Sequence, residues 1–330
     1  MSQRLEELKV WAQETLRLSA VKLEPVSEDA SFRRYFRIQT GCRSSIVMDA
    51  PPPREDCRPF VHVAGLLKAA GVHAPDILAQ DLDRGFLLLS DLGRQSYLDA
   101  LNDENADALF SDAVDALIRW QRASLPGVLP PYDQALLRRE LNLFPEWYVA
   151  RHLNVTLTVA ERTILESVFS LLENSALAQP QVFVHRDYMP RNLMLSTPNP
   201  GVLDFQDAVY GPISYDVVSL FKDAFISWGT ERIEFWRRRY WERAQQTGLP
   251  VQKYSEFTRA FDWMGLQRHF KVLGIFARIN YRDGKPVYLK DTPRFLNYVH
   301  ETGKLYKEFT PLLKLLDALE QRTQGRMAAT

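Results

Sequence analysis

The sequence predicts an α+β protein in two lobes: a β-rich N-lobe with one inserted helix, then a mainly helical C-lobe that carries a β-hairpin. Short β-like runs bounded by turn residues fill most of residues 20–90. Apolar residues three and four apart dominate from Tyr97 onward. One β interlude, from residue 181 to residue 205, interrupts these helices. We therefore divide the chain into residues 1–92 and 93–330.

The N-lobe elements follow from local patterns. Apolar residues between Leu5 and Leu16 recur at roughly helical spacing, so an amphipathic helix is expected over the first 18 residues. Residues 60–70 have the pattern of a second helix, which Gly71 ends. The strand candidates are residues 21–26, 34–39, 44–49, 77–80 and 85–90. Together they predict a small, mostly antiparallel sheet with one inserted helix.

The C-lobe pattern is helical on both sides of the β interlude. The helices expected before it are residues 97–123, 136–152 and 159–177. The β pieces are residues 181–185, 192–195 and 202–205, with a turn at residues 198–201 before the third. From Tyr215 the helical pattern returns and continues to about Gln324.

Composition excludes several classes of protein. The 330 residues include 41 Lys and Arg and 41 Asp and Glu, so the chain lacks the basic excess of a general nucleic-acid binder. Cys42 and Cys57 form no CxxC pair, which argues against a disulfide scaffold or a cysteine zinc site. The longest apolar runs, such as residues 86–89, are too short to span a bilayer, and no apolar signal core opens the chain. We expect a cytoplasmic monomer without nucleic-acid or membrane partners.

The residues that carry chemistry lie in the β interlude. His185, Asp187 and Asn192 form the pattern H-x-D-x-x-x-x-N, and Asp204 follows on the next predicted strand. Phosphoryl transfer needs a carboxylate to take the acceptor proton, and amide and carboxylate oxygens to hold magnesium. We assign Asp187 as the catalytic base and Asn192 and Asp204 as Mg²⁺ ligands, while His185 holds the loop. An Asp that merely caps a turn is the structural alternative.

On these motifs the chain resembles the aminoglycoside phosphotransferase and choline kinase superfamily, a branch of the protein-kinase fold. The resemblance spans nearly the whole chain and implies a bilobal fold with ATP and Mg²⁺ as cofactors. Residues 85–93 resemble the family's strand and interlobe hinge. Adenine would then meet the hinge, at Leu89, Ser90, Asp91 and Leu92. Residues 210–217 resemble the family's helix after the metal-binding aspartate, which makes Asp216 a brace for the catalytic loop.

A narrower resemblance is to the anomeric N-acetylmuramate/N-acetylglucosamine kinases of bacterial cell-wall recycling. It is carried by residues 185–194, 204–208, 29–37 and 282–285. The resemblance implies transfer of the ATP γ-phosphate to the C1 hydroxyl of the amino sugar, in peptidoglycan recycling. The product would be a sugar 1-phosphate that feeds nucleotide-sugar synthesis.

The N-lobe departs from the usual kinase pattern. It has no GxGxxG, and Met48 lies where the phosphate-binding strand lysine is expected. We assign the turn that replaces the glycine-rich loop to nucleotide binding, through Ser31, Phe32, Arg33 and Arg34. The alternative for these arginines is a solvated turn or ion pairs within the fold. The missing lysine also leaves open a non-catalytic nucleotide-binding regulator.

The acceptor is expected in the C-lobe. The residues assigned to the substrate are Glu140, Tyr188, Arg191, Gln206, Arg278 and Arg282. Residues 268–294 are locally basic, which favours an anionic acceptor such as N-acetylmuramate over a cationic one. We expect Arg278 or Arg282 to pair with its lactyl carboxylate. The alternatives are a solvated helix face for these residues, and another acceptor: choline, homoserine or an aminoglycoside.

Overall fold

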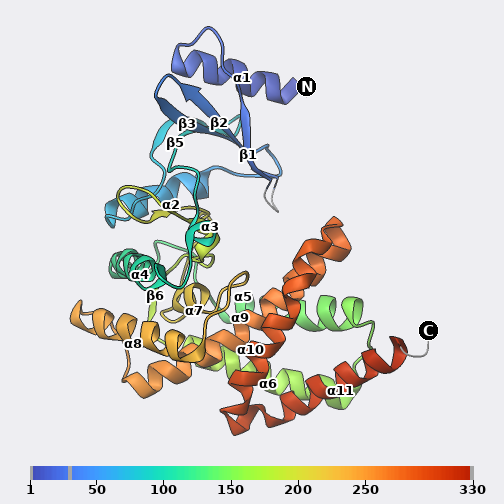
Figure 1. Cartoon of the computed structure of the whole chain (residues 1–330). Coiled ribbons are helices and arrows are strands. Elements are labelled where there is room, and N and C mark those ends of the chain that lie inside the picture. The colour runs from blue at the N-terminus through green and yellow to red at the C-terminus, as the bar shows by residue number, and fades with distance from the viewer. Residues whose placement is uncertain (1–2, 29–31, 328–330) are drawn as a thin grey trace. The chain divides into compact units, whose positions relative to one another are not determined.

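A computed structural model describes residues 3–28 and 32–327 (Figure 1). Its contacts divide the chain into two compact units: residues 1–123 with 190–208, and residues 124–189 with 209–330. No helix among the described residues has the length and apolar character needed to cross a membrane.

The first unit contains the N-terminal sheet. Its elements are α1 (Gln3–Leu16), β1 (Glu24–Glu28), β2 (Arg34–Thr40), β3 (Arg43–Asp49), α2 (Arg58–Ala69), β4 (Ile77–Asp81), β5 (Phe86–Ser90), α3 (Tyr97–Ala100), α4 (Ala106–Arg122), η2 (Pro190–Asn192), β7 (Leu193–Met194) and β8 (Gly201–Val202). Five strands pair antiparallel in the order β1-β2-β3-β5-β4, as the strand pattern predicts. β7 and β8 form a separate two-stranded hairpin.

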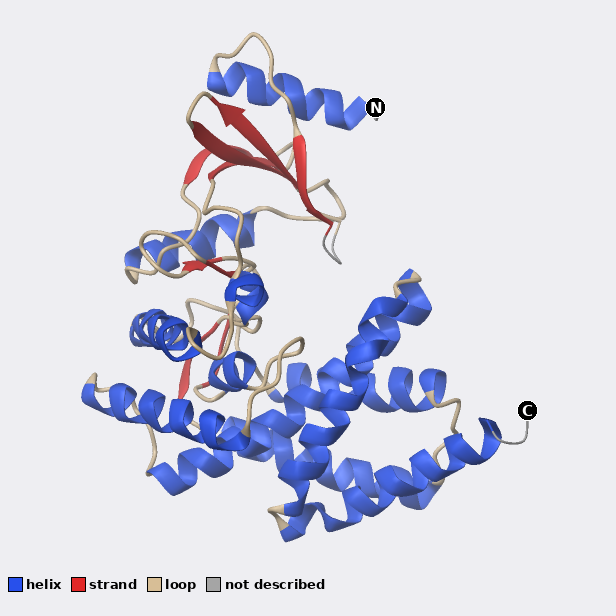
Figure 2. Cartoon of the chain, viewed as in Figure 1, coloured by secondary structure: helices blue, strands red, loops and turns tan. Residues whose placement is uncertain are grey.

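Helix α1 covers one face of this sheet, where the helix and strands share a hydrophobic core (Figure 2). Trp11 packs against Phe86 with ring centroids 5.7 Å apart and the rings tilted by 44°. At the end of β3, the fully buried Asp49 accepts a hydrogen bond from Arg4 Nε at 2.9 Å and pairs with Arg34. The amphipathic pattern of the first 18 residues therefore produces a helix held by both apolar packing and an ion pair.

The second unit is mainly helical. Its elements are α5 (Gln134–Leu143), η1 (Phe144–His152), α6 (Val159–Leu177), β6 (Gln181–Val184), β9 (Val209–Pro212), α7 (Tyr215–Phe221), α8 (Thr230–Gln246), α9 (Tyr254–Asp283), η3 (Pro286–Asp291), α10 (Thr292–Lys304), η4 (Lys307–Phe309) and α11 (Thr310–Met327). The long helix α9 packs against η1, α5, α6, α7 and α10. It carries the core of the unit, with Phe270, Leu273 and Phe276 buried among aromatic and aliphatic side chains.

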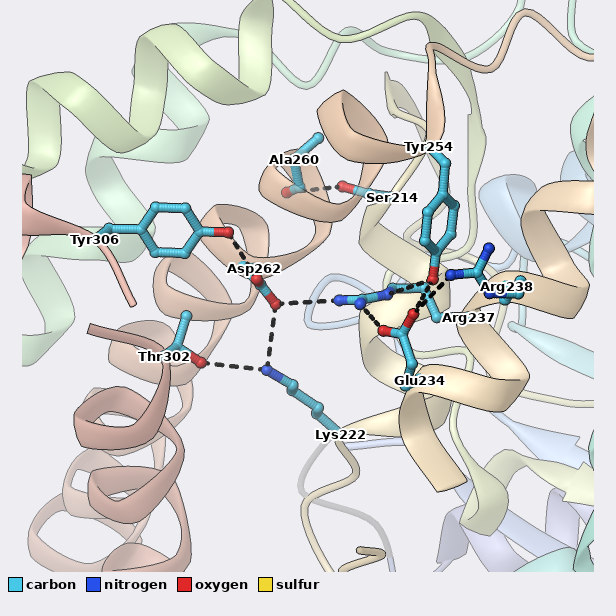
Figure 3. A network of polar contacts seen from close by, with 10 residues as sticks. All are labelled: Ser214, Lys222, Glu234, Arg237, Arg238, Tyr254, Ala260, Asp262, Thr302 and Tyr306. Atoms are coloured by element: carbon cyan, nitrogen blue, oxygen red, sulfur yellow. Dashed lines mark hydrogen bonds and ion pairs between the residues drawn. The ribbon is translucent and has the colours of Figure 1, made fainter. Parts of the chain in front are cut away.

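A polar network joins several of these helices (Figure 3). Asp262 of α9 accepts a hydrogen bond from the Tyr306 hydroxyl at 2.8 Å. The same carboxylate lies 3.5 Å from Arg237 Nη1 of α8 and 3.8 Å from Lys222 Nζ, at the end of α7. Lys222 also donates to the hydroxyl of Thr302 on α10 at 3.2 Å. One buried carboxylate thus links α9 to α8 and to the end of α7, and through Lys222 to α10.

Several expected boundaries are wrong. Residues 97–123 form two helices instead of one, because the Asn102 side chain accepts the backbone N–H groups of Glu104 and Asn105 at 2.9 and 3.0 Å and interrupts the helix. The predicted strand at residues 202–205 stops at Val202. Asp204 has φ +62°, a left-handed conformation that cannot continue a β-ladder.

Two further elements differ from the expectation. Strand β9 is absent from the sequence prediction, although it is the partner of β6. Residues 144–152 form the π-helical segment η1, where a continuation of one helix is expected. Contacts place residues 190–208 in the first unit, where Asn199 donates to Tyr97 and to Asp112 of α4. The nucleotide and acceptor roles of the two predicted lobes stay predictions.

At two glycines of α9, substitution by alanine is expected to change the free energy of unfolding in opposite directions. A Cβ at Gly274 would lie 2.4 Å from a backbone atom of Leu143, so Gly274→Ala forces α5 and α9 apart. The expected loss is about 1–3 kcal/mol of unfolding free energy. At Gly265 the nearest atom would be 3.6 Å away, so Gly265→Ala is expected to gain about 0.5–1 kcal/mol from helix propensity.

Urea denaturation of both variants checks this difference. Equal stability of the two variants would contradict the close helix crossing at Gly274.

Candidate active site

The loop after β6, at residues 185–187, is held by hydrogen bonds to its backbone N–H groups. Asp216, fully buried at the start of α7, accepts the backbone N–H of His185 at 2.7 Å and of Arg186 at 3.0 Å. The imidazole Nδ1 of the buried His185 accepts the backbone N–H of Asp187 at 3.3 Å. Burial raises the pKa of Asp216 to about 7, although its two backbone donors favour the ionised form. The structure therefore gives Asp216 and His185 the loop-holding roles expected for them.

A charged cluster lies against the same loop. The carboxylate of Glu140 on α5 is buried, and four donors reach it: Arg186 Nη2 at 2.5 Å, Lys271 Nζ at 3.0 Å, Gln267 Nε2 at 3.2 Å and the Tyr132 hydroxyl. Burial alone would raise the pKa of this carboxyl, but the charges of Lys271 and Arg186 outweigh it and lower the pKa to about 2. A contact between Glu140 and a sugar would require one of these donors to leave.

The composition of this cluster goes beyond the sequence prediction, which names only Glu140 and a basic stretch. Gln267 and Lys271 are four residues apart and therefore lie on one face of α9. Both are buried. The signal that could have found Lys271 is its position among apolar residues, because a charge inside such a helix requires a partner.

The predicted metal ligands belong to the first unit. Asn192 ends η2, and Asp204 follows β8, where Leu203 N–H donates to the Asn192 carbonyl at 2.9 Å. Asn192 Nδ2 lies 3.5 Å from the Asp204 carboxylate, and Gln206 Nε2 donates to the same carboxylate at 2.9 Å. One amide and one carboxylate are therefore close together, and their oxygens are the hard donors that Mg²⁺ takes. The described contact of Gln206 is with Asp204, and its contact with a sugar stays a prediction.

The arginines of the N-terminal turn have carboxylate partners. Ser31 lies outside the described residues. Phe32 is exposed, and its backbone N–H donates to Glu55 at 3.0 Å. Arg33 Nε pairs with Glu55 at 3.0 Å, and Arg34 pairs with Asp49. Ion pairs within the fold, one of the alternatives weighed for these arginines, are thus present, while their contact with phosphates stays a prediction.

The predicted hinge is anchored to the sheet. Leu89 pairs with strands on both sides, and Ser90 N–H donates to Asp76. Asp91 forms a two-pronged ion pair with the buried Arg37, at 2.5 and 2.9 Å, and Leu92 is buried. These interactions lie within the protein, and contact between the four residues and adenine stays a prediction.

The other predicted substrate residues differ in their surroundings. Tyr188 is buried and packs edge-on against His185 at 5.6 Å, whereas Arg191 is exposed. Arg282 pairs with its neighbour Asp283 at 2.7 Å. Arg278 is half-buried, and among the described residues its Nε has no hydrogen-bond partner. Burial, with the neighbouring Arg282 charge, lowers the pKa of Arg278. Of the two arginines proposed for an anionic substrate, Arg278 is the one that forms no ion pair within the part of the chain that the structure describes.

Comparison with known proteins gives a family match and close relatives for this chain. Residues 22–254 match the family described as the phosphotransferase enzyme family. The chain is 60% identical over 305 residues to the N-acetylmuramate/N-acetylglucosamine kinase of Pseudomonas aeruginosa, with 92% of this chain and 90% of the relative covered. It is 47% identical over 320 residues to the Neisseria meningitidis protein of the same name, with 95% of each covered.

Solved structures share the fold at low sequence identity. Choline kinase LicA from Streptococcus pneumoniae has a TM-score of 0.63 and 14% identity, with 90% of this chain and 99% of that chain covered. The streptomycin–ATP ternary complex of the aminoglycoside phosphotransferase APH(2")-IIa has a TM-score of 0.60 and 15% identity, with 90% and 96% covered. The protein-kinase-like fold, with a β-sheet N-lobe and a helical C-lobe, is thereby confirmed.

The Glu140 cluster predicts a pH-dependent stability. The folded state lowers the pKa of this carboxyl from 4.5 to about 2, so its ionised form stabilises the fold. This stabilisation is fully present above about pH 4.5 and is lost as the pH falls toward 2. Glu140→Gln is expected to cost about 3–5 kcal/mol at pH 7, because it leaves the buried Lys271 and the half-buried Arg186 undercompensated.

Urea denaturation between pH 7 and pH 3 checks this prediction. The difference between wild type and Glu140→Gln should shrink below pH 4.5. A difference that does not change with pH would show that the charge of Glu140 contributes nothing.

Proposed function

Because this chain belongs to the phosphotransferase enzyme family and is a sugar kinase that uses a hydroxyl acceptor, we propose that it phosphorylates N-acetylmuramate, N-acetylglucosamine or both at the anomeric C1 hydroxyl. The phosphoryl donor is ATP, and the product is a sugar 1-phosphate. We propose peptidoglycan recycling as the role of this reaction. A cytoplasmic location, a monomeric state and the lack of nucleic-acid or membrane partners stay predictions.

The choice of C1 is supported by the chemistry of the two sugars. N-acetylmuramate carries its lactyl ether at C3, so a hydroxyl that both sugars offer must be at C1, C4 or C6. The anomeric hydroxyl is the most acidic of these three. A carboxylate is a modest base, and it therefore matches C1 best.

The observation that carries the proposal is the loop with Asp187, held at its backbone by Asp216 and His185. Asp187 orients the C1 hydroxyl and accepts its proton as the phosphoryl group moves. Asn192 and Asp204 would hold Mg²⁺, which when bound neutralises charge on the phosphates. Their amide and carboxylate lie 3.5 Å apart, a donor set suited to this ion.

Release of ADP from Mg-ATP tests the acceptor. We expect turnover with both free amino sugars and none with their 1-O-methyl glycosides, because methylation removes the attacking hydroxyl. Choline, homoserine and kanamycin serve as the other acceptors. Turnover with a methyl glycoside would place transfer at another hydroxyl, and turnover with only the other acceptors would overturn the substrate.

In the same assay, Asp187→Ala tests the base. The expected fall in kcat is about 10²–10⁴-fold, the range for loss of a positioned acid–base group. An Asp187→Ala rate near that of the wild type would refute the assignment.

Arg278 is proposed to bind the lactyl carboxylate of N-acetylmuramate. It lies seven residues after Lys271 on α9, about 10.5 Å along the helix axis. Arg278→Gln should lower kcat/KM for N-acetylmuramate by about 10- to 150-fold, the equivalent of one charged hydrogen bond, and should spare N-acetylglucosamine, which lacks that carboxylate.

Arg282→Gln is the matched control, because Arg282 already pairs with Asp283. Equal losses for the two sugars in Arg278→Gln, or a larger loss in Arg282→Gln, would contradict the assignment of Arg278.

A further inference from the structure

Glu140 takes no part in the reaction proposed above, yet four protein donors converge on its buried carboxylate. We propose that Glu140 is a positioning residue. It holds the Arg186 side chain and thereby keeps the carboxylate of the next residue, Asp187, oriented toward the acceptor hydroxyl. This inference rests on the proposed role of Asp187 as the base. It gives Glu140 a task in turnover that requires no contact with the sugar.

The first argument is the backbone of Arg186. Its φ is +75°, in the left-handed region, where a residue other than glycine carries a cost of about 1–3 kcal/mol. Glycine would adopt this conformation freely. An arginine here is therefore held by its surroundings, and because Asp187 is the next residue, this φ sets the course of the chain into Asp187.

The second argument is the set of contacts that hold Arg186. Asp216 takes its backbone N–H at 3.0 Å, and Glu140 takes its guanidinium at 2.5 Å. The same guanidinium lies over the Tyr132 ring, 6.0 Å from the centroid. Asp216 fixes the main chain and Glu140 fixes the side chain, so the two carboxylates have complementary tasks.

The third argument is charge. Lys271 is a buried cation and Arg186 a half-buried one, and Asp187 is the residue that follows Arg186. Glu140 supplies a competing carboxylate that binds both cations directly. Without that negative charge both cations are undercompensated, and we expect them to draw the carboxylate of Asp187, the acidic residue next to Arg186 in the chain, away from the acceptor hydroxyl.

The fourth argument is the rigidity of the elements that carry the cluster. Glu140 lies on α5, whose first turn is capped by the Asp133 side chain at 2.8 Å. Lys271 and Gln267 lie on α9, which crosses α5 closely at Gly274. Side chains on packed helices hold a geometry more precisely than side chains on loops. Two helices thus fix the side chain of Arg186, while Asp216 of α7 holds its backbone.

The test compares Glu140→Gln with Glu173→Gln. Glu173 of α6 is the matched control, because its carboxylate is also buried and also binds α5. Its partner there is Arg138, and the contacts described for it do not include the loop. We expect both variants to lower the melting temperature. Only Glu140→Gln should lower kcat, on the order of 10²-fold, with both KM values little changed, because a misdirected base acts on the transition state alone.

The measurement is kcat and KM for ATP and for each amino sugar, well below both melting temperatures. A kcat of Glu140→Gln close to wild type would overturn the proposal. An equal loss in Glu173→Gln would also overturn it, because the effect would then follow from weakened packing of α5.

Tyr132→Phe covers the case in which Glu140→Gln does not fold. It removes one hydrogen bond to Glu140 and keeps the ring under Arg186. The expected fall in kcat is about 2- to 10-fold, and an unchanged kcat would overturn the proposal.

Asp187→Ala separates the two hypotheses. If it retains its rate, the proposed base is wrong, whatever Glu140 does. If it loses turnover while Glu140→Gln retains it, only the positioning role of Glu140 is rejected.

Discussion

The ion pairs of the buried Glu140 carboxylate connect parts of the helical unit that lie far apart in the sequence. A charge inside a protein is tolerated only where partners compensate for the lost water. Glu140 meets this condition with Arg186 from the loop and Lys271 from α9. One anion therefore joins α5, α9 and the loop that precedes Asp187. The close crossing of α5 and α9 at Gly274 brings these groups within reach of one another.

The first unit uses charge differently. Arg33 and Arg34 are among the residues expected to bind nucleotide, but Arg33 pairs with Glu55, and Arg34 pairs with Asp49. Met48, where a lysine is expected, is fully buried in β3. The N-terminal sheet is therefore held by an ion pair where β2 begins and β3 ends, and by an apolar interior. Met48 contributes to this apolar interior, at the position where the kinase pattern has a phosphate-binding lysine.

Sequence reasoning succeeded where the signal is local. The five strands and the order of the motifs follow from alternation and turn residues, which act over a few neighbours. It failed where the outcome depends on distant partners. Strand β9 forms because β6 lies beside it, and the left-handed Asp204 ends a strand that its apolar neighbours favour. The Asn102 break was local, but its cue, a side chain that bonds to the next turn, was overlooked.

The sequence by itself determined the chemistry. The spacing of Asp187 and Asn192, with Asp204 further on, predicts phosphoryl transfer, because the reaction needs a carboxylate base and hard oxygen ligands for magnesium. Only the tertiary structure decided which charges are compensated. Glu140 meets a lysine 131 positions later in the chain, whereas Arg278 is left without a hydrogen-bond partner at Nε among the described residues. Such pairings depend on how helices cross, and helix crossings are set by the packing of side chains that are far apart in the sequence.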